Sequence, residues 1–342
     1  MHILKRIYQE RENGKASVLA TVLATSGSTY RKKGAQMVIF EDGEREGQLS
    51  GGCLERDIVE QSIRLLQSNE PLRLLTYVGD DDPVFGFNKG CQGTVHLLLE
   101  KTEWLYQHRS RLLKALALDY PIRYGIWLKD GNAGRQLGSR ILQIGETIIA
   151  DPGMEGIEFM SSDGLHVQQI EREQRLLLIG AGYDAIPVMD LASKLSYEVH
   201  AADYREAHFE RASQQAPGVK LSRVGRDKEA LAEFLLRFST NTAVVIMSHD
   251  FDYDRLALES ALKRSFLYIG VLGPRHRLNR LYGSESPPGC IYSPIGLEIG
   301  AQTPEEIAVS ILGQIIQTFR SRMANVSGDV AVSKKNGELV WR

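Results

Sequence analysis

Early in its C-terminal half the chain reads Arg175-Leu176-Leu177-Leu178-Ile179-Gly180-Ala181-Gly182-Tyr183-Asp184-Ala185-Ile186-Pro187, a short apolar run that passes directly into a glycine turn. An apolar run of this length, ended by glycines, is typical of a strand buried on both faces of a parallel sheet. Gly180, Gly182 and Ala185 follow the GxGxxA spacing of a dinucleotide-binding turn that opens a helix. The free N–H groups of that helix would face a phosphate. The stretch therefore predicts a Rossmann-type unit.

An acidic residue follows the next predicted strand. Residues 198–202 read as that strand, and Asp203 comes 23 residues after Gly180, where a ribose-binding carboxylate is expected. Asp203 predicts a preference for NAD over NADP, although Arg205 could accommodate a 2′-phosphate. An ordinary βαβ crossover, with glycines used only for packing, is the alternative.

Two further buried strands are predicted at residues 243–247 and 266–272. In open α/β sheets, ligands bind outside the carboxyl ends of the strands. The residues expected to share the crevice with Gly180 are therefore His249, Asp250, Gly273 and Arg275. For His249 we keep two interpretations, an acid/base or ligand contact and a loop-capping histidine.

The bulk properties describe an ordinary globular protein. The chain has 342 residues, 43% hydrophobic and 25% charged, which is enough for two or three domains. A net charge of −2 gives no broad footprint for nucleic acid or an anionic membrane. No apolar segment approaches the roughly 20 residues that span a bilayer, so a cytoplasmic protein is expected.

The predicted fold class is α/β, with a C-terminal Rossmann-like, doubly wound parallel sheet and an N-terminal α+β domain. A β-rich segment connects the two. The expected boundaries are residues 1–118 for the N-terminal domain, 119–172 for the connecting segment, 173–325 for the Rossmann-like domain and 326–342 for a polar tail.

Residues 24–37 combine small hydroxyl and glycine residues with three cations and read as a long exposed loop. Ser28 and Arg31 make this loop a candidate anion cradle of hydroxyl, backbone N–H and guanidinium groups. A solvated connection between two strands is the alternative.

Cys53 follows Gly51 and Gly52 at the start of a helix predicted from Cys53 to about Gln67. Unpaired N–H groups and the helix dipole favour a thiolate there, which would also be a soft metal ligand. A buried, inert thiol is the alternative. Cys91 lies in a second glycine-rich loop, and the two cysteines could face a common cleft.

Several blocks together resemble the xanthine dehydrogenase accessory factor family (XdhC/CoxI). In the N-terminal half they are residues 27–37, Ser50-Gly51-Gly52-Cys53-Leu54-Glu55, and Gly90-Cys91-Gln92-Gly93 with residues 95–100. In the C-terminal half they are Gly180-Ala181-Gly182, Asp203-Tyr204-Arg205, Met247-Ser248-His249-Asp250, and residues 268–273 and 293–308. The sequence departs from the usual family pattern at Tyr30, Asp184 and Gln92.

The resemblance implies an accessory protein rather than a turnover enzyme. Family members are thought to bind the molybdenum cofactor (molybdopterin) and protect it while a cysteine desulfurase supplies its terminal sulfur. They then pass it to an apo molybdenum hydroxylase of the xanthine dehydrogenase or CO dehydrogenase type. We therefore expect Cys53, Cys91 and His249 to be the chemically active residues, Cys53 to contact the metal, and the protein to form a homodimer.

Two other functions compete with this one. The first is an NAD(P)-dependent oxidoreductase that uses Gly180, Gly182 and Asp203, with His249 as acid or base. Against it stands the lack of a persuasive Tyr-xxx-Lys or paired acid/base motif. The second is a sensor in which a bound nucleotide changes the affinity for a protein partner.

Overall fold

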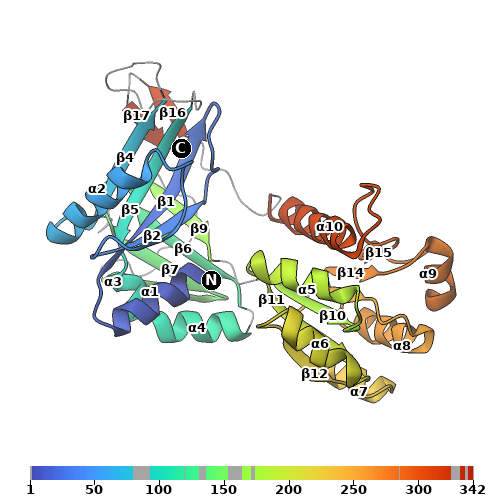
Figure 1. The fold of residues 1–342 in the computed structure, drawn as a ribbon. Coiled ribbons are helices and arrows are strands. Elements are labelled where there is room, and N and C mark those ends of the chain that lie inside the picture. Colours follow the sequence, from blue (N-terminus) through green and yellow to red (C-terminus); the bar gives the residue numbers. More distant parts are fainter. Residues whose placement is uncertain are drawn as a thin grey trace. The chain divides into compact units, whose positions relative to one another are not determined.

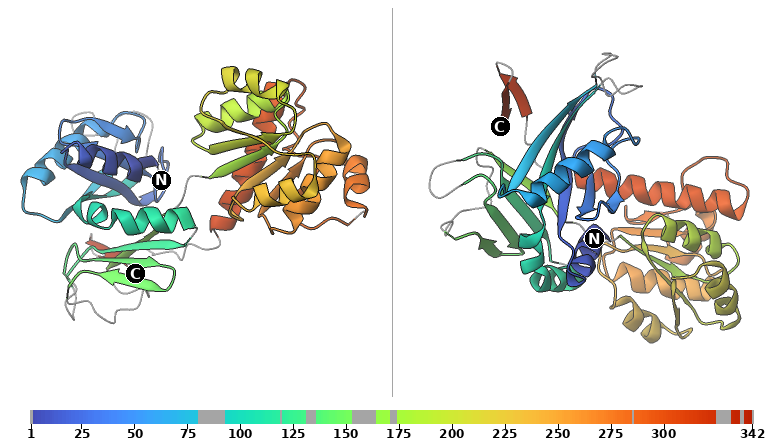
Figure 2. Two further views of the ribbon diagram at one scale, coloured as in Figure 1. Left: turned by 90° about the horizontal axis from the view of Figure 1, so that it is seen from below. Right: turned by 60° about the vertical axis from the view of Figure 1, so that its left-hand side comes forward.

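The chain divides into two compact units in a computed structural model (Figures 1 and 2). One unit comprises Met1–Arg172 and Asp329–Arg342, and the other comprises Glu173–Gly328. The structure describes residues 2–79, 93–118, 120–130, 136–152, 164–170, 174–284, 286–324, 332–335 and 338–341. Among the helices in these ranges, none has the length and apolar character needed to cross a membrane.

The second unit contains a six-stranded sheet in the order β12-β11-β10-β13-β14-β15. Every neighbouring pair is parallel, and counted within the unit the order is 3-2-1-4-5-6, that of dinucleotide-binding folds. The strands are β10 (Arg175–Ile179), β11 (Glu198–Asp203), β12 (Lys220–Arg223), β13 (Ala243–Ile246), β14 (Tyr268–Val271) and β15 (Ile291–Tyr292). The predicted parallel, doubly wound sheet is confirmed.

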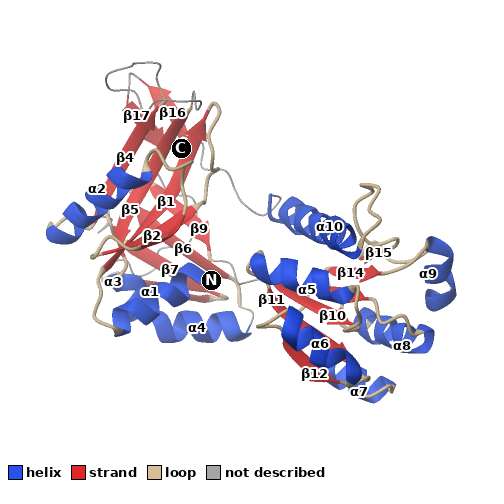
Figure 3. Cartoon of the chain, viewed as in Figure 1, coloured by secondary structure: helices blue, strands red, loops and turns tan. Residues whose placement is uncertain are grey.

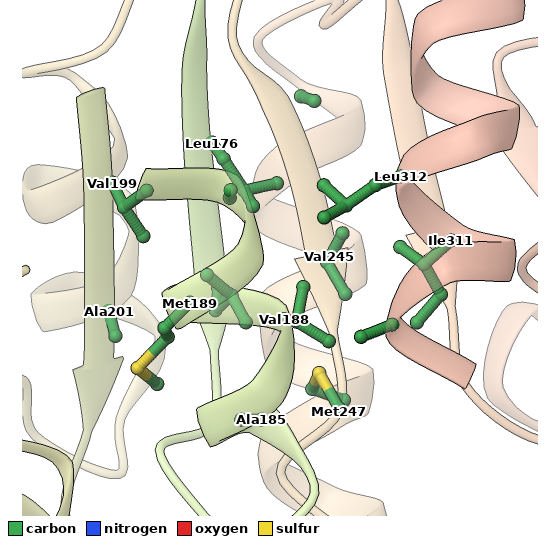
Figure 4. Packing of buried hydrophobic residues seen from close by; sticks show 14 of the residues in the cluster. Leu176, Ala185, Val188, Met189, Val199, Ala201, Val245, Met247, Ile311 and Leu312 are labelled. Atoms are coloured by element: carbon green, nitrogen blue, oxygen red, sulfur yellow. The ribbon is translucent and has the colours of Figure 1, made fainter. Parts of the chain in front are cut away.

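Helices cover both faces of this sheet because its central strands are apolar on both sides. Leu176 and Leu178 belong to one core, with α5, α6 and α10, while Leu177 and Ile179 belong to the other, with α7, α8 and α9. Figure 4 shows the first core, where side chains of α5 and α10 meet those of the strands. The helices are α5 (Ala185–Lys194), α6 (Ala207–Gln215), α7 (Lys228–Leu235), α8 (Phe251–Leu262), α9 (Arg275–Tyr282) and α10 (Pro304–Ala324).

The first unit contains a five-stranded antiparallel sheet in the order β3-β2-β1-β5-β4 (Figure 3). Its strands are β1 (Ser17–Ser26), β2 (Gln36–Phe40), β3 (Arg45–Gly47), β4 (Leu72–Val78) and β5 (Thr94–Lys101). Helix α2 (Glu55–Gln67) packs on one face through Ile58 and Leu65. The other face shares a core with α1 (His2–Glu12), α3 (Glu103–Gln107) and α4 (Arg109–Leu118).

The segment predicted to connect the two domains forms a second antiparallel sheet, in the order β8-β7-β6-β9. Its strands are β6 (Ile122–Trp127), β7 (Arg140–Ile144), β8 (Thr147–Ala150) and β9 (Leu165–Gln169). Ile122, Tyr124 and Leu142 from this sheet belong to the same core as α1 and α4. The segment is therefore part of the first unit's core. Within the predicted tail, β16 (Val332–Lys335) and β17 (Glu338–Trp341) pair antiparallel.

Candidate functional site

The strand order of the first unit brings three motif-bearing loops to one end of the five-stranded sheet (Figure 1). Ser26, the last residue of β1, pairs with Thr94, the first of β5, which also faces Val78 at the end of β4. On the other side, Gly47 at the end of β3 pairs with Met37 near the start of β2. Residues 27–35 and 48–54 leave this end. Gly79 and Gly93, the described residues on either side of residues 80–92, also lie here, and the Gly79 N–H donates to the Gly93 carbonyl at 2.9 Å.

Two of these loops touch at Gly93. A Cβ atom placed on Gly93 would lie 2.5 Å from the carbonyl oxygen of Ser28 and 2.6 Å from the Cγ2 atom of Thr29. Only glycine fits here, because the chain enters β5 directly against the hydroxyl-rich loop. The block that carries Cys91 therefore reaches the sheet beside Ser28. Cys91 itself lies outside the described residues.

The hydroxyl-rich loop presents cations without counter-ions from the described parts of the chain. Ser28 and Arg31 are exposed, and the guanidinium of Arg31 lies 5.7 Å from the ring centroid of Tyr30, which is itself exposed. Lys32 and Lys33 beside it are also exposed. A group of positive charges beside the exposed Ser28 is suited to an anion.

The loop before α2 is held by a buried carboxylate. Glu55 is only 3% exposed, and its Oε1 atom accepts hydrogen bonds from the N–H groups of Ser50 at 2.7 Å and Leu49 at 3.3 Å. The hydroxyl of Ser50 donates to the other carboxylate oxygen and accepts from the N–H groups of Gly52 and Leu54, both at 3.1 Å. Burial opposes ionisation of Glu55, but these hydrogen bonds outweigh it and lower its pKa.

Cys53 lies in this braced loop, two residues before α2, and is exposed. The thiol is therefore not buried, whereas the alternative interpretation required a buried one. The predicted start of the helix is two residues early, since α2 begins at Glu55. Gly52 has a φ of +109°, a backbone conformation that favours glycine, and Gly51 beside it is exposed. Considering the described residues alone, no group of three or more His, Cys, Asp or Glu side chains could hold a metal ion.

In the second unit, the two glycines of the predicted phosphate loop have different roles. Gly180 has a φ of +120°, and a Cβ atom there would lie 2.7 Å from the backbone of Met247 and Ser248 at the end of β13. Around Gly182 the nearest atoms to such a Cβ are at 3.5 Å and 3.9 Å, an ordinary contact distance. Protein packing requires Gly180 but not Gly182, which leaves the backbone of Gly182 open to a ligand.

Asp203 is fully buried and is held by donors from the protein itself. Its carboxylate accepts the N–H of Ala181 at 2.9 Å and both Nε and Nη2 of Arg205 at 2.9 Å, and His208 Nδ1 lies 3.1 Å away. Arg205 Nη2 also donates to the carbonyl of Ser248 at 2.8 Å. Burial opposes ionisation of Asp203, but the hydrogen bonds from Arg205 and Ala181 outweigh it and lower its pKa to about 2. A ribose hydroxyl would have to share these oxygens.

His249 pairs with Asp184, a contact that the sequence did not predict. Its Nε2 atom lies 2.6 Å from Oδ2 of Asp184, 65 positions earlier in the chain. The contact links the loop after β13 to the start of α5, at the point where the strand order reverses. His249 has a φ of +61° and is 60% exposed, so a ligand can reach the ring.

Asp250, next to His249 in the chain, has a structural role as the N-cap of α8. It caps α8 by accepting the N–H of Tyr253 at 3.0 Å, and it accepts the hydroxyl of Tyr204 at 2.8 Å and a guanidinium N–H of Arg226 at 2.9 Å. Burial opposes its ionisation, but the hydrogen bonds from Tyr253 and Arg226 outweigh it and lower its pKa to about 2. Tyr204 and Arg226 were not among the predicted site residues. Tyr204 lies in the block Asp203-Tyr204-Arg205, but its position in the sequence does not specify a contact with Asp250.

Two arginines of α9 follow the loop after β14, and they have different roles. Arg277 donates to Asp254 at 2.7 Å and to the carbonyl of Leu272 at 3.2 Å, so it is an internal brace. Gly273 has a φ of +112° and passes close to the Arg277 side chain. Arg275, at the start of α9, is exposed and forms no ion pair with any residue in the described ranges. Arg275 is thus the cation available to a ligand at this edge.

Both halves of the chain match models of one protein family. The model of the XdhC Rossmann domain matches residues 176–315, and the model of the XdhC and CoxI family matches residues 10–78. A Bacillus subtilis protein, named as a probable subunit of xanthine dehydrogenase, is 33% identical over 92% of this chain and 96% of its own. An Escherichia coli protein named molybdenum cofactor insertion chaperone PaoD is 24% identical over 92% of this chain and 86% of its own.

A crystal structure from Bacillus halodurans, described as a xanthine dehydrogenase, is also similar. It has a TM-score of 0.78 and 29% sequence identity, and the match covers 95% of this chain and 97% of the other. The similarity thus spans both units in fold and in sequence. The chain therefore belongs to the XdhC and CoxI family.

Proposed function

We propose that the protein is a molybdenum-cofactor chaperone that binds the cofactor, protects it during sulfuration and inserts it into an apo molybdenum hydroxylase of the xanthine dehydrogenase or CO dehydrogenase type. Support at family level comes from the similarity to the chaperone PaoD over 92% of the chain. A cysteine desulfurase is the proposed sulfur source, and a homodimer the proposed assembly.

The exposed thiol of Cys53 is the observation that carries this proposal. Cys53 belongs to residues 48–54, and this loop leaves the same end of the sheet as the hydroxyl-rich loop with Ser28 and Arg31. The cargo is a soft metal held by sulfur, with an anionic phosphate, so it needs a soft donor and a cationic cradle. Cys53 supplies the first, and Arg31 with the exposed backbone of Gly51 supplies the second, while the N–H of Gly52 beside it is engaged by the Ser50 hydroxyl. Cys91 is the proposed second thiol.

The second unit offers a separate candidate phosphate site, which we propose for a nucleotide or for cofactor that is not held at Cys53. The proposed contacts are the open backbone of Gly182 beside Gly180, the cation of Arg275 near Gly273, and His249. Asp203, Arg205 and Asp250 would then shape the crevice, because their polar atoms already bond within the protein.

An NAD(P)-dependent oxidoreductase remains the second candidate, favoured by the 3-2-1-4-5-6 strand order. Protein donors on both oxygens of Asp203 favour the chaperone instead, because a dinucleotide would have to compete for them.

The test is copurification from a molybdate-fed host, with bound molybdenum and pterin measured per chain and client activation assayed. We expect wild-type protein and Cys290→Ala to retain cofactor, since Cys290 is a half-buried thiol in the other unit. Cys53→Ala should lose both retention and activation while its melting temperature stays unchanged, with Cys91→Ala less severe. Unchanged occupancy and activation in Cys53→Ala would remove this thiol from the mechanism. Steady NAD(P)H turnover with a carbonyl substrate would support the oxidoreductase.

A further inference from the structure

Residues 293–308 have no role in the site described so far. They include the loop between β15 and α10 and the first turns of α10, and they form most of the wall of a cleft of about 320 Å³. Leu272 and Gly273, which follow β14, and Ser310 of α10 complete the wall. The cleft is at the low end of the range for small-ligand sites, roughly 300 to 1,000 Å³, which suits a ring system rather than a whole dinucleotide.

Hydrogen bonds to α10 hold the cleft in shape. The Ser310 hydroxyl donates to the carbonyl of Leu297 at 2.6 Å. The Gln314 amide accepts the N–H of Gly296 at 3.0 Å and donates to the Gly296 carbonyl at 2.9 Å, and Tyr268 fixes the Gln314 oxygen at 2.7 Å. Because these hydrogen bonds fix the loop to α10, ligand binding would require little ordering of the chain.

The cleft is apolar with one acid. Leu297, Ile299 and Ile307 line it, and Ile299 is 53% exposed, which is high for a large apolar side chain. Glu298 is the one charged residue of the lining, and within the described residues no cation pairs with it. The lining therefore suits a flat ring that donates N–H groups, and it disfavours an anion.

The adjoining helix end gives no anion site either. The first turn of α10 is closed by its own capping box, in which Thr303 Oγ1 accepts the N–H of Glu306 at 3.2 Å and Glu306 accepts the N–H groups of Gln302 and Thr303. The negative charges of Glu298 and Glu306 both oppose a phosphate here.

The cleft and the glycine loop lie at the same edge of the parallel sheet. It lies at the carboxyl end of β14, two strands from β10 in the sheet order, with β13 between them. Neighbouring strands are about 4.8 Å apart, so the lateral separation is about 10 Å. A ligand with its phosphate at Gly182 would thus extend over the loop of His249 and place a ring in the cleft.

We propose that this cleft binds a ring with a 2-amino-4-oxopyrimidine edge, with Glu298 accepting hydrogen bonds from the amino group and the neighbouring ring N–H. A carboxylate accepts from two such parallel donors, and the apolar walls cover the ring faces. The pterin of the molybdenum cofactor carries this edge, and this assignment rests on the proposed function. Guanine nucleotides carry the same edge.

The experiment is a fluorescence titration of full-length protein, freed of cofactor, with 6-hydroxymethylpterin, GMP and AMP. Glu298→Gln should weaken pterin binding by about tenfold or more, because the ring N–H groups lose a charged acceptor. Glu305→Gln is the matched control, since Glu305 is exposed in the same stretch and does not line the cleft. Tighter binding of the pterin identifies the cofactor ring, and tighter binding of GMP identifies a guanine nucleotide.

A second variant tests the cleft without removing the acid. Ala301→Trp should fill it and abolish pterin binding, with the melting temperature as the check on folding. Equal affinity for AMP, or unchanged pterin affinity in both folded variants, would overturn the cleft assignment. If wild-type protein still delivers cofactor to its client in that case, the proposed function stands. If wild-type protein retains no cofactor, the proposed function fails, whatever the titration shows.

Discussion

The carboxylate of Asp203 accepts the N–H of Ala181 at 2.9 Å, which ties the second strand of the parallel sheet to the glycine loop that follows the first. The same carboxylate neutralises Arg205, and Arg205 continues to the carbonyl of Ser248 at the end of β13. Three strand ends are thus joined through one buried acid. Contacts within the protein therefore hold these strand ends together at the reversal of strand order.

We expect Asp203→Ala to lower the free energy of unfolding by about 2 to 4 kcal/mol, because it leaves Arg205 and the N–H of Ala181 without their acceptor. Urea unfolding followed by circular dichroism measures this. Asp190→Ala is the control, since Asp190 forms only an exposed helical pair with Lys194 and should change stability by less than about 0.5 kcal/mol. If Asp203→Ala lowered the free energy of unfolding by less than about 0.5 kcal/mol as well, Asp203 would not be the acid that joins the strand ends.

The contribution of Asp203 should also depend on pH. Its pKa of about 2 in the folded protein lies below the ordinary value of 3.8, so the unfolded chain binds the proton first as the pH falls. The stabilisation is therefore complete above about pH 5 and is lost as the pH falls from about 4 towards 2. Unfolding measured across this range should show the difference between wild type and Asp203→Asn shrinking. A constant difference would argue against the ionised carboxylate as its cause.

The two glycines of the phosphate loop should respond in opposite ways to alanine. Gly180→Ala must place a methyl group 2.7 Å from the end of β13 at a φ of +120°, so we expect poor folding or a large fall in melting temperature. Gly182→Ala should keep the melting temperature but weaken a ligand that approaches its backbone. Thermal melts beside ADP titrations separate the two effects. A Gly182→Ala variant that binds ADP as well as wild type does would exclude this loop as the phosphate site.

If a dinucleotide binds, we expect NAD to bind more tightly than NADP. The buried negative charge of Asp203 repels a 2′-phosphate, and three donors of Arg205 are already engaged with Asp203 and Ser248. Calorimetric titration with both nucleotides gives the ratio directly. Tighter binding of NADP would overturn the predicted preference.

The sequence predicted those features that depend on local pattern. The apolar run before Gly180 indicated a strand buried on both faces, and its alternate residues do point into two separate cores. The positions of His249 and Gly273 after buried strands placed them at one edge of a parallel sheet, because all such strands end on the same side. These inferences need only periodicity and strand direction.

Pairings over long distances in the sequence could not be predicted in the same way. The approach of His249 to Asp184 depends on how two loops turn after their strands, and neither loop has a pattern that specifies this. The approach of Gly93 to Ser28 in the first unit depends on β1 pairing with β5 as well as β2. The segment at residues 119–172 shows only alternation, which indicates strands but not the core that they join.

Glu55, the buried hydrogen-bond acceptor two residues after Cys53, should keep that thiol in position. Glu55→Ala removes the acceptor for two backbone N–H groups and for the Ser50 hydroxyl, so we expect a loss of about 2 to 3 kcal/mol in unfolding free energy. Cys53 should remain accessible to iodoacetamide in this variant, yet cofactor retention should fall because the loop no longer holds the thiol in place. Glu55→Gln, which keeps one carbonyl acceptor, should restore part of the retention. Glu60→Ala is the control, since Glu60 makes only an exposed pair with Arg64 on the same helix. If Glu55→Ala lowers stability while retention per folded chain stays at the wild-type level, the braced loop supports the fold alone and Cys53 needs no fixed position.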